Sequence, residues 1–134
     1  MDEQERLRQG EGIRREVLGD AHVDRSQAGR SDFNGDFLDL ITRYAWGEIW
    51  DRPGLSRRQR SLITIAMLAV LGREAELKLH LRAARNNGVS REELKETLLQ
   101  VAIYGGVPAA NTAFQLAEEA LAASYCDGGA GSGA

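Results

Sequence analysis

Cysteine and histidine are scarce in this sequence of 134 residues, and their scarcity narrows the possible chemistry. The single cysteine, Cys126, precedes a Gly-rich stretch. One chain can therefore form no disulfide, no CxxC redox pair and no cysteine metal site. The two histidines, His22 and His80, show neither HxxxH nor HExxH spacing. We therefore expect no bound metal ion.

Long apolar runs and an excess of one charge are also missing. The longest apolar run, LITIAMLAVLG, is too short to span a bilayer, and the charged start MDEQERLRQGEG lacks the apolar core of a signal peptide. The 17 basic and 20 acidic residues leave a net charge of -3, and the basic residues are scattered along the chain. We expect a cytoplasmic protein that binds neither a membrane nor nucleic acid.

The apolar residues recur with helical spacing, and no useful strand alternation is present. The length suits one domain, which we place at residues 1–126, with a disordered Gly-rich tail at 127–134. The predicted fold is all-α, a single-domain bundle of about six helices.

Glycine and proline set the expected boundaries in the first half of the chain. A charged helix over residues 3–18 stops at Gly19, and residues 20–36 form a long loop. A second helix runs from about Asp36 towards Trp50, where DRPG ends it. Ser56 caps the next helix, RRQRSLITIAMLAVLG, whose second half is apolar nearly all round. Such a helix lies in the middle of a bundle or at a subunit interface.

The second half of the chain carries three further helix signals. Gly88 suits the left-handed position that ends the helix holding residues 74–85. Ser90 and Glu93 form a capping box for a helix that continues through Tyr104. Pro108 then starts the last helix.

The stretch EAELKLHLRAARNNG, residues 74–88, places two ionisable side chains on an apolar helix face. Glu76 and His80, one turn apart, fall near the centre of an arc of leucines and alanines. Burying either group unpaired costs several kcal/mol, so the two pair together, meet other polar groups, or line a cavity that a ligand completes. A carboxylate beside an imidazole suits proton transfer near neutral pH. The competing interpretation is a structural ion pair.

Several more residues are candidates for binding a ligand. Arg60 lies near the buried side of its helix and could offer its guanidinium fork to a substrate carboxylate. Trp46 and Trp50, one turn apart, form either core or a pocket wall, and His22 lies in the expected loop, where a histidine is usually solvated. The segment YGGVP is a plain turn or an opening where backbone N–H groups approach a ligand.

Three segments in order, RREVLGDAHVD, RYAWGEIWDRPGLSRRQRSLITIAMLAVLGR and ELKLHLRAARNNGVSREELKETLLQVAIYGGVPAANTAF, resemble the carboxymuconolactone decarboxylase family over about residues 10–122. The resemblance implies an alkylhydroperoxidase D-like helical fold that assembles as trimers or hexamers. Peroxidases of that superfamily carry CxxCxxxH on the same helix. His80 matches the motif histidine, while Glu76 and Arg73 replace the cysteines. The implied site transfers protons without disulfide chemistry.

The resemblance also implies a reaction, the loss of CO2 from 4-carboxymuconolactone to give the 3-oxoadipate enol-lactone. This step belongs to the protocatechuate branch of the β-ketoadipate pathway. The substrate is a small dicarboxylate lactone, and no cofactor is expected because the lactone carbonyl itself accepts the electrons. A related lactone could be the true substrate of a decarboxylase or isomerase. A binding protein that kept the fold is also possible, as is a thiol peroxidase, against which the missing cysteines argue.

The implied site assigns a role to each candidate. His80 delivers the proton and Glu76 orients it, although the two could exchange roles. Arg60 holds the acetate arm or the lactone oxygen. Trp46, Trp50 and Tyr104 form the pocket wall, and His22 reaches the pocket from the same or a neighbouring subunit.

Overall fold

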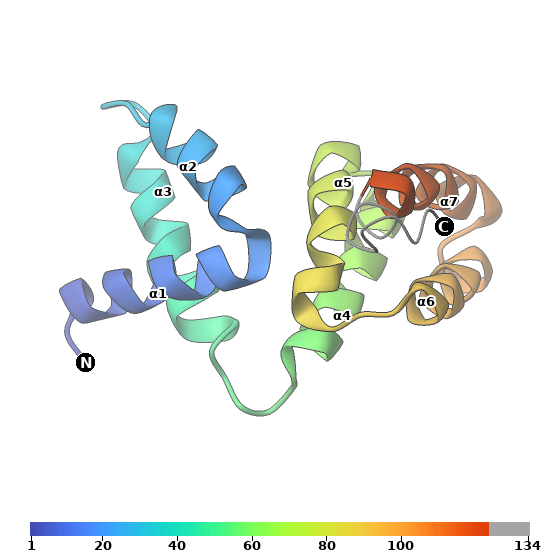
Figure 1. The fold of residues 1–134 in the computed structure, drawn as a ribbon, viewed down its shortest axis with the longest axis horizontal. Coiled ribbons are helices and arrows are strands. Elements are labelled where there is room, and N and C mark those ends of the chain that lie inside the picture. Colours follow the sequence, from blue (N-terminus) through green and yellow to red (C-terminus); the bar gives the residue numbers. More distant parts are fainter. Residues whose placement is uncertain (124–134) are drawn as a thin grey trace. The chain divides into compact units, whose positions relative to one another are not determined.

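The computed structural model describes residues 1–123, and all regular structure within them is helical. In chain order (Figure 1) the helices are α1 Glu3–Leu18, α2 Asp20–Ala28, α3 Gly35–Ile41, the π-helix η1 Thr42–Ile49, α4 Arg57–Leu71, α5 Glu74–Ala83, the 3-10 helix η2 Ala84–Asn87, α6 Arg91–Tyr104 and α7 Val107–Leu121. The all-α prediction is confirmed, with one more α-helix than the six expected. The tail predicted at 127–134 lies outside the described residues.

The chain forms two compact units, Met1–Arg57 and Arg58–Ala134, which we call the N-terminal and C-terminal units. The N-terminal unit contains α1 to η1, and the C-terminal unit contains α4 to α7. That residues 1–126 act as one domain stays a prediction.

The start of the N-terminal unit follows the sequence prediction only in part. α1 is capped by Asp2, whose carboxylate accepts a hydrogen bond from the backbone N–H of Glu5, and it ends at Gly19, where φ is 93°. The loop predicted over 20–36 is wrong in its first half, because Asp20–Ala28 is helical. This helix buries a single apolar side chain, Val23, so its sequence carries no apolar period to reveal it.

α1 crosses η1 with backbone nearly touching backbone. A Cβ atom on Gly10 would lie 1.9 Å from the carbonyl oxygen of Thr42, and one on Gly47 would lie 2.7 Å from the carbonyl oxygen of Arg6. The helix predicted from about Asp36 towards Trp50 is present as α3 followed by η1. The two glycines therefore allow the close packing of α1 on this helix.

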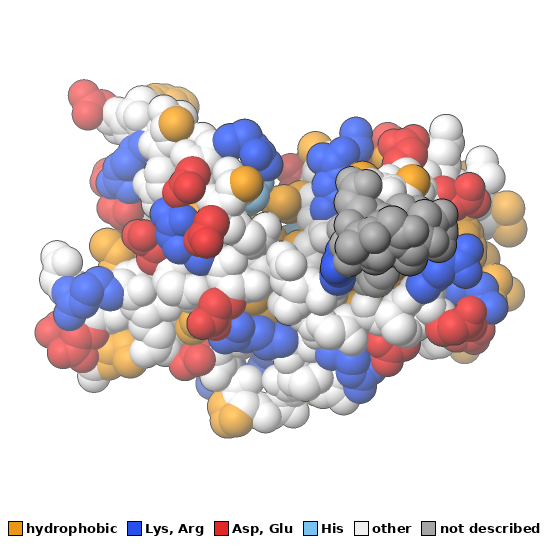
Figure 2. Space-filling view, viewed as in Figure 1, with side chains coloured by type: hydrophobic (Ala, Val, Ile, Leu, Met, Phe, Trp, Pro, Cys, Tyr) orange, Lys and Arg blue, Asp and Glu red, His pale blue; other side chains and the backbone are white. Residues whose placement is uncertain are grey.

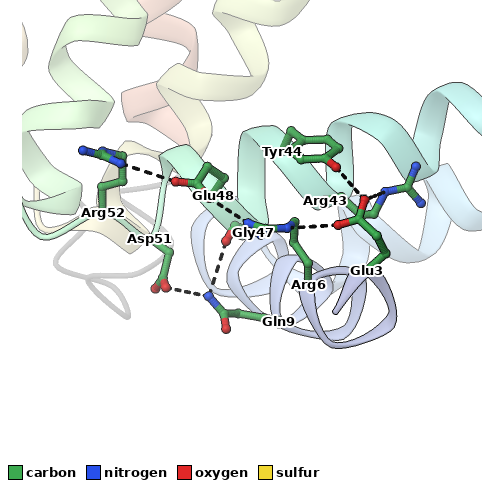
Figure 3. Close-up of polar contacts among 9 residues, drawn as sticks. All are labelled: Glu3, Arg6, Gln9, Arg43, Tyr44, Gly47, Glu48, Asp51 and Arg52. Atoms are coloured by element: carbon green, nitrogen blue, oxygen red, sulfur yellow. Dashed lines mark hydrogen bonds and ion pairs between the residues drawn. The ribbon is translucent and has the colours of Figure 1, made fainter. Parts of the chain in front are cut away.

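Polar contacts hold the same crossing (Figure 3). Arg6 Nη1 donates to Glu48 Oε1 at 2.7 Å, and the Tyr44 hydroxyl donates to the carboxylate of Glu3. Gln9 Nε2 donates to Asp51 Oδ2 at 2.6 Å and to the carbonyl oxygen of Gly47 at 3.3 Å. The contacts of Tyr44 and Asp51 are exposed and contribute little to stability, whereas those of Arg6 with Glu48 and of Gln9 with Gly47 are partly buried.

The core of the C-terminal unit is built from α4, α5, α6 and α7. α5 and α6 both pack on α7, which offers the small side chains of Ala110, Ala113, Ala117 and Ala120. The fully buried members of this core with the largest side chains are Ile65, Leu77, Leu81, Leu94 and Leu98.

The helix boundaries of this unit confirm the sequence prediction. Gly88 adopts φ 80°, in the left-handed region, and ends η2. Ser90 and Glu93 form the capping box of α6, with both reciprocal hydrogen bonds present. Pro108 lies in the first turn of α7. Helix ends were predictable here because each has a local chemical cause.

α4 is less buried than its sequence predicts. Ser61, Ile65 and Ala69 are its buried residues, whereas Ile63, Met67, Val70 and Leu71 are between 43% and 70% exposed. A position in the middle of a bundle is therefore wrong for the single chain. A place at a subunit interface, which the sequence also allows, stays a prediction.

Candidate active site

α5 holds the two residues that the sequence predicts for proton transfer, and its sequence explains how it is placed. Glu74 and Glu76 lie in its first turn and His80 in its last, the arrangement that the helix dipole favours. Leu77, Leu81 and Ala84 are almost fully buried. Their packing fixes the rotation of α5 about its axis.

His80 is buried, with 9% of its surface exposed, as its place on the apolar face predicts. Glu76 is exposed in the single chain, so the expected burial of this carboxylate is wrong. The buried residues of α5 are Leu77, His80, Leu81 and Ala83. At about 100° of rotation per residue, Glu76 points between His80 and Ala83, so its exposure reflects its place in the first turn of α5.

The arginines at the start of α4 differ in their surroundings. Arg57 Nη1 donates to Glu16 at 2.6 Å, and Arg58 donates to Glu93, so both take part in ion pairs. Arg60 is half-buried and precedes Ser61, which is fully buried. Sequence reasoning missed the buried Ser61 hydroxyl, although its place four residues before Ile65 on the apolar stripe could have revealed it.

Tyr104 ends α6 and is 85% exposed. It borders a groove in the C-terminal unit, which we call the α4–α6 groove, lined by Leu62, Ile63, Ala66, Val70, Thr97, Gln100, Val101 and Tyr104. Next to it, a Cβ atom on Gly105 would lie 2.6 Å from Val70 Cγ2, and Gly106 adopts φ 105°. These glycines serve a tight inter-helix turn, the plainer of the two interpretations of YGGVP.

The remaining three candidates belong to the N-terminal unit. Trp46 and Trp50 stack with ring centroids 5.1 Å apart, and Trp46 is only 7% exposed, which favours a core role for it. His22 is half-buried on α2, not in a loop. Burial lowers the pKa of His22, and the positive charges of Arg14 and Arg25 lower it further.

The structure thus places Arg60, Glu76, His80 and Tyr104 on α4, α5 and α6 of one unit, and His22, Trp46 and Trp50 in the other. Sequence reasoning also missed Arg14, which is 5% exposed. Its spacing with Gly10, Val17 and Leu18 puts it on the buried stripe of α1, a signal that the sequence contains.

Within residues 1–123, His, Cys, Asp and Glu form no cluster of three or more that could hold a metal ion. No helix in this part of the chain is long and apolar enough to cross a membrane. On the face drawn in Figure 2, acidic and basic side chains are interspersed.

Comparison with known proteins agrees with this architecture. The carboxymuconolactone decarboxylase family matches residues 35–119. The chain is 55% identical over 119 residues to a 4-carboxymuconolactone decarboxylase of Acinetobacter baylyi, covering 89% of each chain. It is 42% identical over 102 residues to a nitrosuccinic acid decarboxylase of Metarhizium robertsii, covering 75% of this chain and 70% of that one. A 4-carboxymuconolactone decarboxylase of Pseudomonas putida, matched over its full length of 48 residues, is 54% identical and covers 36% of this chain.

The described residues are all-helical, and the family that matches residues 35–119 has the alkylhydroperoxidase D-like class of fold. Within that class, this chain belongs to the carboxymuconolactone decarboxylase family.

Proposed function

We propose that this protein is a carboxy-lyase that converts 4-carboxymuconolactone into the 3-oxoadipate enol-lactone, in the protocatechuate branch of the β-ketoadipate pathway. The observation that carries the proposal is the 55% identity to the Acinetobacter enzyme of that name, over 89% of both chains. We place the reaction in the cytoplasm.

The proposed reaction needs no electron acceptor apart from the substrate. The bond between the ring carbon and the leaving carboxylate breaks, and its electron pair forms a new ring double bond. The former double bond shifts towards the lactone carbonyl, whose oxygen takes up the negative charge. A proton added to the carbon beside that carbonyl completes the product. The protein must desolvate the leaving carboxylate, stabilise the oxyanion and supply that proton.

We assign the proton to His80 and its orientation to Glu76. The burial of His80 on a rigid core helix supports the first assignment, because a fixed imidazole can meet a substrate carbon in one geometry. The place of Glu76 one turn before His80, on the same side of α5, supports the second.

The remaining roles concern binding. Arg60 is assigned to the acetate arm or the lactone oxygen, because a cation on the leaving carboxylate would stabilise the ground state and oppose the reaction. Trp46, Trp50 and Tyr104 are assigned to the pocket wall, and His22 to a polar contact with substrate. Because Trp46 is buried, only a small part of its ring is open to a substrate.

Turnover of freshly prepared 4-carboxymuconolactone tests the function and the site together. We expect wild type to form the enol-lactone, and His80→Ala to lose about 100-fold or more in kcat, the size expected for a general acid. Wild-type protein that leaves the lactone unchanged would refute the function. A folded His80→Ala variant with full activity would show that another residue is the general acid.

Glu76 has a matched control on its own helix. Glu74 and Glu76 are both exposed carboxylates in the first turn of α5. Glu76→Gln should lower kcat by about tenfold or more, whereas Glu74→Gln should leave it unchanged. If the two substitutions lower kcat equally, the effect comes from the loss of a negative charge at the start of α5 and not from a specific role of Glu76 in the site.

The Metarhizium relative is named for a different acid, so the substrate range needs its own test. Nitrosuccinate and lactones related to 4-carboxymuconolactone should be compared by kcat/KM. A higher kcat/KM for one of these compounds would support the assignment as a carboxy-lyase but would replace 4-carboxymuconolactone as the proposed substrate.

We also propose that the protein assembles as a homo-oligomer, a trimer or hexamer, through the apolar side chains of α4, α6 and α7. Ile63, Val70, Ile103 and Val107 are between 43% and 79% exposed in the single chain, and Ile63 and Val70 line the α4–α6 groove. Such a patch of exposed apolar side chains is typical of an interaction surface. Sedimentation equilibrium should give a trimer or hexamer for wild type and smaller species for Ile103→Glu, and a monomeric wild type would refute the proposal.

A further inference from the structure

Arg14 is a buried cation, and most of its N–H donors have no hydrogen-bond acceptor. It lies on α1 and is 5% exposed. Its Nη2 donates to Ser26 Oγ at 2.9 Å, whereas its buried Nε and Nη1 atoms have no hydrogen-bond partner in the structure. These two nitrogens carry three of the five N–H donors of a guanidinium.

No carboxylate among residues 1–123 forms an ion pair with Arg14. Glu11, the acid whose charge it senses, pairs with Arg15 at 3.5 Å. Burial lowers the pKa of Arg14, and the charge of Arg15 lowers it further. A guanidinium stays protonated in proteins, so burying this unpaired charge lowers the stability of the folded chain.

Further positive charge lies on α2 near Arg14. His22 lies on α2, which packs on α1, and it senses the charges of both Arg14 and Arg25. Ser26, on the same helix, fixes one end of the guanidinium through its hydroxyl. We call Arg14, His22, Arg25 and Ser26 the α1–α2 cluster. A buried cation without an ion-pair partner is stabilised by a bound anion.

We propose that the α1–α2 cluster is a carboxylate-binding site in which Arg14 makes the direct contact, Ser26 positions it and His22 lies alongside. The donors that remain on Nε and Nη1 suit an oxygen-rich planar anion. The choice of ligand rests on the proposed function: Arg14 takes the acetate carboxylate, which stays with the product.

The first experiment measures binding without turnover. Adipate, a stable six-carbon dicarboxylate, is titrated calorimetrically into wild type, Arg14→Met, Arg14→Lys and Arg8→Met. Arg8 is exposed on the same helix and serves as the control. Wild type and Arg8→Met should bind adipate alike. Arg14→Met should bind it about 10- to 100-fold more weakly, as expected for lost hydrogen bonds to a charged group, and Arg14→Lys should fall between.

Thermal unfolding without ligand separates binding from a structural role. If Arg14 exists for a ligand, Arg14→Met removes an unpaired buried charge, and its Tm should equal or exceed that of wild type. A marked loss of Tm in both Arg14 variants, with adipate affinity unchanged in Arg14→Lys, would make Arg14 structural and overturn the proposal. So would equal adipate affinity in wild type and Arg14→Met.

A second comparison identifies the carboxylate that is bound. Arg14→Met should lower kcat/KM for 4-carboxymuconolactone by about 10- to 100-fold, yet match wild type on the methyl ester of its acetate arm, which offers no anion. An equal loss on both substrates would overturn the assignment to the acetate carboxylate. If wild type does not turn over the lactone, the proposed function fails, and adipate binding still decides the role of Arg14.

Discussion

The crossing of α1 over η1 predicts opposite effects for two neighbouring glycine-to-alanine substitutions. Gly10 and Gly12 both lie inside α1, where alanine is favoured over glycine by about 1 kcal/mol. A Cβ atom on Gly12 would have nothing within 4 Å, so Gly12→Ala should stabilise the protein by that amount. At Gly10 the new atom would lie 1.9 Å from the carbonyl oxygen of Thr42, where ordinary contact begins at 3.4 Å.

That clash is with backbone, so no side chain can rotate to relieve it. Overpacking of this kind costs roughly 1–3 kcal/mol and occasionally more, and we expect Gly10→Ala to lie at the upper end. After the gain in helix propensity is subtracted, the variant should lose about 1–2 kcal/mol. The two variants should therefore differ by about 2–3 kcal/mol in their free energies of unfolding.

Urea unfolding measures this difference, with tryptophan fluorescence reporting on Trp46 and Trp50 beside the crossing and circular dichroism reporting on the helices. Wild type gives the reference midpoint and slope. Equal stability of Gly10→Ala and Gly12→Ala would refute the close packing of α1 on η1.

Three further predictions concern stability. Leu81→Ala should cost about 2–5 kcal/mol, measured by thermal unfolding, because Leu81 is fully buried in the core of the C-terminal unit; a loss below about 1 kcal/mol would contradict that packing. Ser90→Ala should cost about 0.5–2 kcal/mol by removing the capping box of α6, and Ser90→Gly should cost less. The pKa of His22 is lowered in the folded chain, so the unfolded chain binds more protons below the ordinary value of 6.5. The free energy of unfolding therefore decreases as pH falls from that value towards the lower folded pKa. In urea unfolding between pH 8 and pH 5, wild type should lose more of this free energy than His22→Gln. Equal losses in the two proteins would refute the lowered pKa of His22.

Most of the fold of the C-terminal unit could be predicted, because its helix ends have local causes. Gly88, the Ser90 and Glu93 box, and Pro108 each act through their own backbone or a neighbour three residues away. α2 could not be predicted in this way. α2 buries only Val23 and packs on α1, and a contact between helices leaves no mark on the local sequence.

Arg14 shows a different limit of sequence reasoning. Its spacing on the buried stripe of α1 is readable, yet an arginine at the edge of an apolar face usually extends its charged end into water. Only the structure shows that Nε and Nη1 are buried and lack a partner. Spacing can place a charged residue on a face, but it cannot place the end of a long side chain.

In the sequence, Glu76 and His80 are candidates for a site because a buried carboxylate and a buried imidazole both need polar partners. The structure removes half of that reason, since Glu76 is exposed in the single chain while His80 is buried. An exposed carboxylate costs nothing to keep, so its presence needs no ligand and no ion pair. What remains is positional: Glu76 lies one turn before His80 on the same side of α5, where a second subunit or a bound substrate would cover both at once. The orienting role that we propose for Glu76 thus depends on such a cover. We expect Glu76→Gln to change kcat while leaving the stability of the single chain unchanged, whereas His80→Ala changes both.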